Sequence, residues 1–263
     1  MSVSYLRFGM AVSLTGRYAP LGKQVLAGVQ AYVNWVNAAG GLRLHESTGG
    51  YEIKLHFIDD KSDPSAMEGN LEYLFSQYPI DILLGPYGSG LGLAAAKYAE
   101  SREIVLWNHS SSADQIFSSG FRWVVGLISP ASQYLCAVLK MVERSDIPLN
   151  KLVLVNANTG FAQDMAIGVI DWSNANNVEC TQFSYASGIE SFSEIIKQVQ
   201  NAKPDVLLGV GRVEDDIHLA SALIESCIDI PIMGLVVAAI DEFKKKLKHA
   251  SEGFLAPSQW EPG

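Results

Sequence analysis

Two short loops carry most of the residues that could do chemistry in this sequence of 263 residues. Residues 85–90 (GPYGSG) place a serine among glycines, and residues 108–112 (NHSSS) hold a histidine and three serines. A serine beside a histidine can act as a nucleophile with its general base, and Asp59 or Asp60 could orient the histidine. The same hydroxyl groups can instead hold an anionic ligand together with main-chain N–H groups.

The spacing in the first loop argues against hydrolysis and against nucleotide binding. A nucleophile elbow follows the pattern G-x-S-x-G, whereas Tyr87 and Gly88 precede Ser89 here. No Gly-Lys-Ser/Thr follows these glycines, and the turn after the first predicted strand (SLTGRYAPLG) lacks G-x-G-x-x-G. A hydrolase that uses Ser89 or Ser111 with His109 stays open as an alternative. We predict that the chain is not an enzyme and has no catalytic residue, metal or cofactor.

Anion binding suits the first loop because a helix is predicted to begin there. Main-chain N–H groups at a helix start and the positive end of its dipole favour a carboxylate, and glycines let the main chain approach one closely. Ser89 would add a hydroxyl donor, and it could also serve as the N-cap of the helix. These two roles are not exclusive.

Strands and helices alternate along the whole chain. Strands are predicted at residues 5–13, 51–59, 80–86 and 103–107, and again at 151–157, 178–184, 205–210 and 230–236. Helices are predicted at about 23–39, 65–78, 89–101, 130–144, 162–176, 191–202 and 213–227. The alternation indicates an α/β fold of two Rossmann-like lobes with parallel sheets, joined near residue 126.

Composition limits the classes of function. The chain is 48% hydrophobic and 18% charged, which is typical of a globular protein with a substantial core. A net charge of −9 argues against nucleic acid and against a polybasic membrane surface. No apolar run approaches the roughly 20 residues of a membrane span, and no secretory signal precedes the first strand. Cys136, Cys180 and Cys227 are predicted to be buried rather than bridged.

Several charged clusters are predicted to have structural roles. The carboxylates of Glu214, Asp215 and Asp216 fall in the first turn of a predicted helix, where they offset its dipole. Asp59, Asp60 and Asp63 are predicted to form and cap a turn rather than bind a cation. The lysines between residues 244 and 248 are predicted to form a solvated helix face.

Ligands of open parallel sheets bind at the carboxyl ends of the strands. This rule selects residues 13–22, 59–64, 86–90 and 107–112 in the first half, and 156–161, 211–213 and 235–238 in the second. If the two lobes present these loops toward each other, the loops form a cleft.

Five stretches occur in an informative order: residues 14–42 (LTGRYAPLGKQVLAGVQAYVNWVNAAGGL), 58–64 (IDDKSDP), 83–90 (LLGPYGSG), 105–117 (VLWNHSSSADQIF) and 253–263 (GFLAPSQWEPG). Together they resemble type I periplasmic binding proteins of the branched-chain amino-acid and amide-binding group. The resemblance implies two lobes joined by three hinge strands, with a ligand clamped between them. It also suggests a fragment, because chains of this group continue past the last stretch.

The resemblance implies specific ligand contacts. Ser89 would hold a carboxylate together with Ser110 and Ser111, Tyr18 and Leu21 would touch the side group of the ligand, and Phe161 would act as an aromatic lid. The full set of expected contacts is Tyr18, Leu21, Tyr87, Gly88, Ser89, Ser110, Ser111, Phe161, Arg212 and Val236.

One expected contact departs from the group. Amino-acid binders carry an acidic residue, which pairs with the ligand ammonium, where this chain has Val236. Unless Glu214 or Asp216 substitutes for it, the ligand would lack an α-amino group, because a buried ammonium without a counter-charge is costly. An organic acid, an aromatic acid or an amide would then fit, and Arg212 could pair with a second anionic group.

The expected protein is an extracytoplasmic or periplasmic substrate-binding protein of an ABC transporter, whose permease would be its partner. A ligand-sensing regulator or receptor input domain of the same fold, cytoplasmic in the case of a sensor, stays open as an alternative. The expected domains are residues 1–125, residues 126–252 and a second hinge crossing at 253–263, with hinge motion near Gly126 and Ala256.

Overall fold

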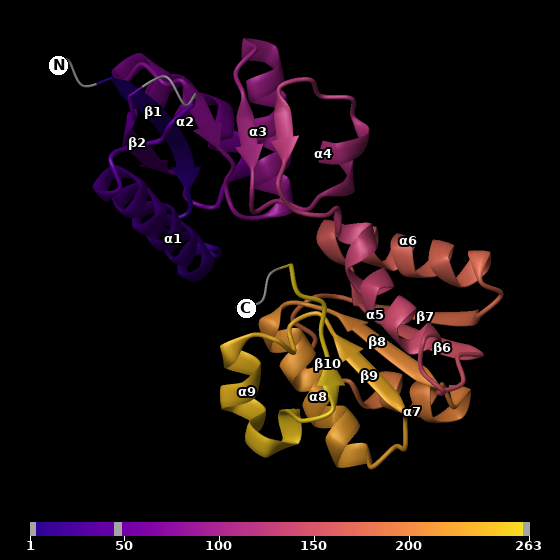
Figure 1. Ribbon diagram of the computed structural model, residues 1–263. Helices are drawn as coiled ribbons and strands as arrows, with labels where there is room; N and C mark the ends of the chain where they lie inside the picture. The colour runs from indigo at the N-terminus through magenta and orange to yellow at the C-terminus, as the bar shows by residue number, and fades with distance from the viewer. Residues whose placement is uncertain (1–3, 45–48, 260–263) are drawn as a thin grey trace. The chain divides into compact units, whose positions relative to one another are not determined.

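The computed structural model describes residues 4–44 and 49–259 and divides the chain into two compact units. The first unit covers residues 1–128 and the second covers residues 129–263. Both are built from alternating strands and helices (Figure 1), as the sequence pattern predicted. The predicted limits of the lobes stay predictions, and the last four residues of the expected hinge crossing lie outside the described residues.

The first unit contains a five-stranded parallel sheet in the order β2-β1-β3-β4-β5. The central strand β1 pairs in parallel with β2 on one side and with β3 on the other. The strands are β1 (Tyr5–Val12), β2 (Glu52–Asp59), β3 (Ile82–Leu84), β4 (Leu106–Asn108) and β5 (Val124–Gly126).

Helices pack on both faces of this sheet. Successive residues of a strand point to opposite faces, so Ala11 of β1 joins the core under α2 and α3, whereas Met10 and Val12 join the core under α1. The helices are α1 (Ala19–Ala38), α2 (Met67–Gln77), α3 (Ser89–Arg102) and the short α4 (Asp114–Ser118). The valine repeat predicted for α1 does face this core, where Val33 and Val36 are buried.

The second unit contains its own five-stranded parallel sheet in the order β10-β9-β8-β6-β7. The strands are β6 (Lys151–Ala157), β7 (Glu179–Tyr185), β8 (Val206–Val210), β9 (Ile232–Leu235) and β10 (Phe254–Leu255). Strands β6 and β8 are almost wholly buried, as is typical of parallel strands covered on both faces. β10, in the stretch expected to cross between lobes, pairs in parallel with β9 in this sheet.

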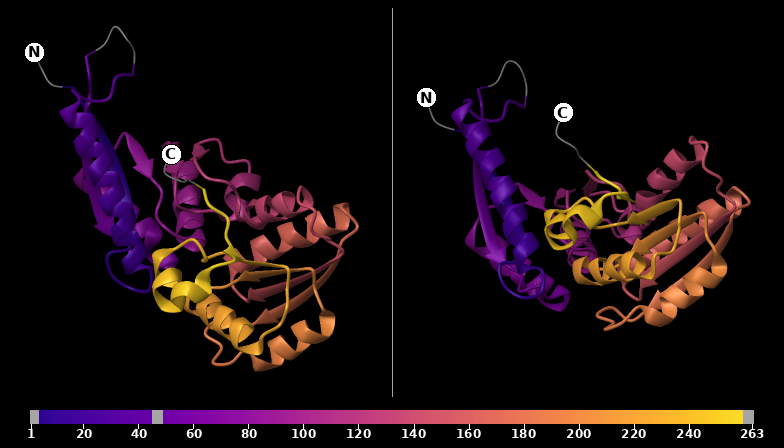
Figure 2. Two further views of the ribbon diagram at one scale, coloured as in Figure 1. Left: turned by 60° about the horizontal axis from the view of Figure 1, so that its bottom comes forward. Right: turned by 90° about the horizontal axis from the view of Figure 1, so that it is seen from below.

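Five helices belong to the described part of the second unit. Helices α5 and α6 pack together, and α7, α8 and α9 form a second series of neighbours, so both faces of the sheet are covered (Figures 1 and 2). Their bounds are α5 (Tyr134–Glu143), α6 (Gly160–Ala175), α7 (Ser193–Ala202), α8 (Val213–Ser226) and α9 (Asp241–Leu247). The lysines of α9 are exposed, as predicted.

The two sheets have the same topology. In each unit the first strand lies between the second and the third, and the fourth and fifth follow on the far side of the third. This is the doubly wound order with a switch point beside the first strand, where ligands of such sheets bind. The switch point lies between β1 and β3 in the first unit and between β6 and β8 in the second.

A few element boundaries differ from the prediction. The strand predicted at residues 103–107 occupies Leu106–Asn108, because α3 continues to Arg102 and ends on Glu103 in the left-handed region, at φ 56°. Leu21, predicted on a loop, lies in the first turn of α1. The helix begins early because Pro20 sits in that turn, where its missing N–H group costs nothing.

Candidate ligand-binding site

Hydrogen bonds join the two polar loops of the first unit. The loops at residues 85–90 and 108–112 follow the neighbouring strands β3 and β4. The N–H of Gly88 in the first loop donates to the carbonyl of Ser110 in the second over 3.2 Å. The Ser111 hydroxyl lies 2.8 Å from the carbonyl oxygen of Pro86 and 2.9 Å from that of Gly88. The fold therefore brings Tyr87, Gly88, Ser110 and Ser111 together.

Ser111 is fully buried, and its hydroxyl connects the two loops instead of serving as an exposed donor. Its side chain is 0% exposed, and its only proton is directed at main-chain carbonyls. Asn108, also buried, holds the second loop in shape: its side-chain nitrogen donates to the carbonyl of Ser111 over 2.7 Å, and its oxygen accepts from the Ser111 N–H over 3.2 Å. Ligand contact by this loop would thus have to come from its main chain or from Ser110.

Ser89 is the first residue of α3, and its hydroxyl makes no hydrogen bond to any part of the chain that the structure describes. The capping role is wrong, because Gly88 is the N-cap residue and no side chain caps the helix. Gly88 has φ 99°, a conformation that L side chains rarely adopt. The first N–H groups of a helix have no partner within it, so α3 presents main-chain donors next to the Ser89 hydroxyl.

Two tyrosines stand beside this helix start. The rings of Tyr18 and Tyr87 meet edge to face, with centroids 5.9 Å apart, and the guanidinium of Arg17 lies 4.6 Å from the centre of the Tyr18 ring. Tyr18 is the N-cap residue of α1, and Leu21 lies half-buried in the first turn of the helix. Tyr18 follows β1 and Tyr87 follows β3, so the pair marks the switch point of the first sheet.

The acidic turn after β2 stabilises this end of the sheet. Asp59 accepts hydrogen bonds from the N–H and hydroxyl groups of Thr15, which hold the pKa of Asp59 below its ordinary value despite the opposing effect of burial. Asp60 is 0% exposed and accepts from the Ser13 hydroxyl over 2.6 Å; burial raises its pKa. Asp63 accepts from the N–H of Ser65 and caps the next turn. The predicted turn-forming and capping roles are confirmed.

A catalytic triad is not assembled among the described residues. His109 Nδ1 lies 2.5 Å from the hydroxyl of its neighbour Ser110, and no hydrogen bond links the ring to Ser89 or Ser111. Desolvation lowers the pKa of His109. The two candidate acids, Asp59 and Asp60, bind groups in residues 13–15 and 61–62 instead.

The predicted second-unit contacts follow three neighbouring strands. Phe161 is the second residue of α6 after β6, Arg212 is the N-cap of α8 after β8, and Val236 follows β9. These strands are adjacent and parallel, so the three residues share one edge of the sheet. The Phe161 ring packs edge to face on Tyr134 with centroids 6.1 Å apart, Arg212 is exposed, and Val236 is half-buried.

Two buried polar groups lie behind this edge. Asp216 is 0% exposed and Tyr185 is 5% exposed, and in the part of the chain that the structure describes neither the carboxyl oxygens nor the phenol oxygen has a hydrogen-bond partner. Burial raises the pKa of Asp216 to about 8, with a smaller contribution from the neighbouring Asp215 carboxylate, and burial also raises the pKa of Tyr185. Asp215, in contrast, accepts from the Ser187 hydroxyl and the Gly188 N–H over 2.8 Å each.

The burial of Asp216 was not predicted from the sequence, which indicated only a first-turn carboxylate and a possible partner for a ligand ammonium. The signal was present, since Asp216 precedes Leu219, Ala220 and Leu223 by three, four and seven residues. These four residues form one buried face of α8. A carboxylate that continues an apolar helix face must be buried with it.

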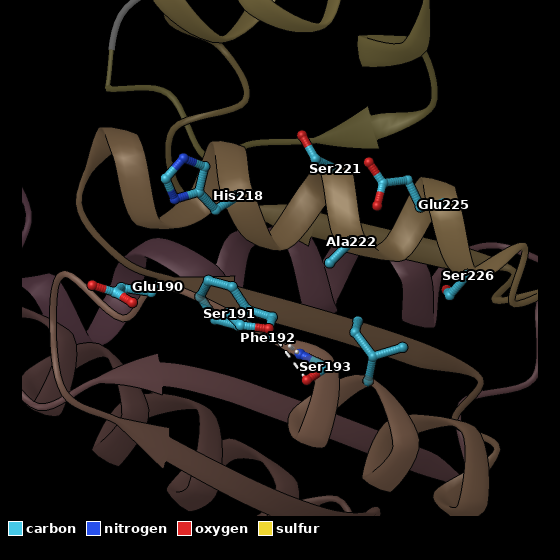
Figure 3. A pocket seen from close by; sticks show the side chains of 10 residues that line it. Glu190, Ser191, Phe192, Ser193, His218, Ser221, Ala222, Glu225 and Ser226 are labelled. Carbon is cyan, nitrogen blue, oxygen red and sulfur yellow. Dashed lines mark hydrogen bonds between the residues drawn. The ribbon is translucent and has the colours of Figure 1, made fainter.

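A groove of about 460 Å³ lies between α7 and α8 (Figure 3). Phe192, Ile196 and Ala222 line its apolar part, and Glu190, His218 and Glu225 lie around it. None of the predicted contacts lines this groove, and no motif in the sequence indicated it. In the described parts of the chain, no three metal-binding side chains gather at one point, and no helix is both long and apolar enough to cross a membrane.

Comparisons with known proteins agree on the family. The sequence profile described as "Periplasmic binding protein" matches residues 6–263. A relative, the Leu/Ile/Val-binding protein BraC3 of Rhizobium johnstonii, is 21% identical over 230 residues, covering 87% of this chain. The chain spans only part of its curated relatives, with matches that cover 28% to 60% of their lengths.

Solved structures show the same fold at low sequence identity. The branched-chain amino acid transporter substrate-binding protein LivJ from Streptococcus pneumoniae, in complex with isoleucine, superposes with a TM-score of 0.78 at 18% identity and covers 95% of this chain and 70% of its own. A solute-binding protein of an ABC transporter from Rhodopseudomonas palustris, in complex with 3,4-dihydroxybenzoic acid, has a TM-score of 0.69 at 15% identity, covering 89% and 62%. The profile match over nearly the whole chain and the two doubly wound units show that the chain belongs to the periplasmic binding protein family.

Proposed function

We propose that the chain forms the ligand-binding part of an ABC-transporter substrate-binding protein that captures a small carboxylate-bearing molecule. The carboxylate would sit at the start of α3, held by main-chain N–H groups and by the hydroxyl groups of Ser89 and Ser110. Tyr18, Leu21 and Tyr87 would contact the rest of the ligand. No bond of the ligand is broken.

The observation that carries this proposal is the arrangement of the two first-unit loops. Their hydrogen bonds fix Gly88 next to Ser110, and the Ser89 hydroxyl, at a helix start, has no partner within the described residues. Aromatic rings stand next to the same helix start. Fixed donors at the positive end of a helix dipole, with apolar rings alongside, suit a small organic anion.

Phe161, Arg212 and Val236 would be the ligand contacts of the second unit, and the ligand-bound form would be recognised by a permease. The match to the periplasmic binding protein family supports a periplasmic or other extracytoplasmic location for this chain. The two solved structures described above hold isoleucine and 3,4-dihydroxybenzoic acid. Amino acids and aromatic acids are therefore the first ligands to test.

A non-enzymatic role is supported by the site as well as by the family. The hydroxyl of Ser111 is committed to main-chain carbonyls, and His109 contacts Ser110 alone among the serines considered as nucleophiles or ligand contacts. A hydrolase would need its base beside the nucleophile and an acid behind the base.

Isothermal titration calorimetry with amino acids, aromatic acids, dicarboxylates and amides tests the proposal. We expect at least one carboxylate to bind, and its amide counterpart to bind at least about tenfold more weakly because the charge-assisted hydrogen bonds are lost. Ser89→Ala should weaken binding about tenfold without lowering the melting temperature. Ser101→Ala, at the opposite end of α3, is the matched control and should bind like the wild type.

Two results would contradict the carboxylate site. One is equal affinity of wild type and Ser89→Ala for every ligand that binds. The other is equal affinity for an acid and its amide. Turnover of ester or amide substrates by the wild type would instead support the hydrolase alternative.

A further inference from the structure

The groove between α7 and α8 is lined by none of the residues that the proposed function assigns to the ligand (Figure 3). Its volume of about 460 Å³ falls within the range of small-molecule sites, roughly 300–1,000 Å³. All of its lining residues belong to the second unit, so its shape depends on that unit alone. The groove can therefore be considered as a binding site in its own right.

The floor of the groove is apolar. Phe192 and Ile196, one turn apart at the start of α7, are 3% and 7% exposed, and the half-buried Ala222 of α8 lies across from them (Figure 3). The Phe192 ring packs edge to face on the buried Tyr185, with centroids 5.0 Å apart. Such a floor favours a ligand with an apolar body, because contact with the floor removes hydrocarbon from water.

The polar side chains around this floor present mainly hydrogen-bond acceptors. Ser221 and Ser226 each donate their only hydroxyl proton to a main-chain carbonyl of α8, over 2.9 and 2.7 Å. Their oxygens can therefore only accept from a ligand. The Ser191 hydroxyl donates to that of Ser193 over 3.2 Å, which leaves Ser193 as a hydroxyl donor at the start of α7. No lysine or arginine in the described part of the chain lines the groove.

The two carboxylates of the groove lie in different electrostatic settings. Glu225 lies in the last turn of α8, which holds no basic residue, so its charge adds to the negative end of the helix dipole. Glu190 precedes the start of α7, where the positive end of that helix offsets its charge, and His218 lies toward the same end of the groove (Figure 3). Neither carboxylate forms an ion pair or a hydrogen bond within the described residues. The Glu225 end is therefore the more negative end.

We propose that this groove is a second binding site, for a small organic cation with an apolar body, such as an arylalkyl amine. The ammonium group donates to the Glu225 carboxylate and to the Ser226 hydroxyl oxygen, and the apolar body lies on Phe192, Ile196 and Ala222. An amine supplies both the hydrogen-bond donors and the positive charge that the lining of the groove lacks. The carboxylate of an acid would be repelled here, so this ligand class differs from that of the proposed function, and the two sites stand or fall separately.

NMR titration of the isotope-labelled protein at pH 7, where alkyl amines are charged, measures both the affinity and the location of binding. The probe is 3-phenylpropylamine. It is compared with the neutral 3-phenylpropan-1-ol, with the anionic 3-phenylpropanoate, and with propylamine, which lacks the ring. Glu225→Gln and Glu190→Gln each remove one carboxylate charge and keep the shape of the side chain. Glu143→Gln is the matched control, because Glu143 is also an exposed carboxylate at the end of a helix but lies outside the groove.

We expect 3-phenylpropylamine to shift the amide signals of α7 and α8 most. It should bind about three- to fivefold more tightly than the alcohol, which is the range for an exposed charge pair, and about tenfold or more tightly than propylamine, because the ring is buried on the floor. Glu225→Gln should reduce the affinity for the amine to about that for the alcohol. Glu190→Gln should have a smaller effect, and Glu143→Gln should behave like the wild type.

Three results would overturn this inference. One is a set of amide shifts that spreads over both units without a maximum at the groove, as nonspecific attraction of a cation to an acidic protein would produce. The second is equal affinity of the groove for the amine and for the alcohol or 3-phenylpropanoate. The third is equal affinity of the wild type and Glu225→Gln for the amine.

Discussion

Replacing Asp216 should change how the stability of the second unit depends on pH. The carboxyl has a pKa of about 8 in the folded chain and an ordinary value of 3.8 when unfolded. Between these values only the folded state keeps the proton, so unfolding releases it and the free energy of unfolding falls as pH rises. The fall should be about 1.4 kcal/mol per pH unit, flattening above pH 8. Asp216→Asn carries no proton to lose and should lack this slope.

Urea unfolding of wild type and Asp216→Asn at pH 5.5, 6.5 and 7.5 measures the effect. The wild type should lose about 2.5 kcal/mol relative to the variant over this range. Asp60, whose pKa is also raised, and Asp59 and Asp63, whose pKa values are lowered, are present in both proteins and cancel in the difference. Hydrogen exchange of β8 peptides assigns the change to the second unit. A difference between the two proteins that is the same at all three pH values would refute the reasoning.

Three further substitutions test the packing of the first unit. Ser111→Ala should lower the free energy of unfolding by about 1–3 kcal/mol, because the buried carbonyl of Pro86 loses its hydroxyl donor and that of Gly88 keeps only the N–H of Gly92; an unchanged urea midpoint would contradict this. Gly92→Ala should destabilise by about 1–3 kcal/mol, since its methyl group would meet the Ser111 hydroxyl at 2.0 Å, and thermal unfolding measures this. Gly28→Ala, mid-helix with open space around it, should raise stability by about 0.5–1 kcal/mol and is the control for the general effect of Gly→Ala.

Most of the fold could be predicted from local patterns in the sequence. Alternating apolar strands and helix-period repeats are properties of neighbouring residues, and they predicted both doubly wound sheets. Boundaries differed from the prediction where two local preferences competed. Pro20 drew the start of α1 forward over Leu21, and Glu103 ended α3 in a left-handed conformation that sequence alone rarely reveals.

Part of the candidate site was also predictable. The rule that ligands bind at the carboxyl ends of parallel strands selected both first-unit loops, and the structure joins them through Gly88, Ser110 and Ser111. The roles of the individual serines were not predictable, because a hydroxyl can donate to a ligand or to a carbonyl with equal ease. Which it does depends on burial, and burial is a property of the folded chain.

The sequence by itself determined the α/β class, the two-unit organisation, the loops at the strand ends and the family resemblance, since each depends on patterns of neighbouring residues. Only the tertiary structure decided that Ser111 connects the loops, and that the Ser89 hydroxyl and the Asp216 carboxyl have no hydrogen-bond partner among the residues described. These outcomes depend on which residues distant in sequence come together and exclude water. Desolvation and hydrogen-bond supply, which set the pKa of Asp216, exist only once that packing is complete.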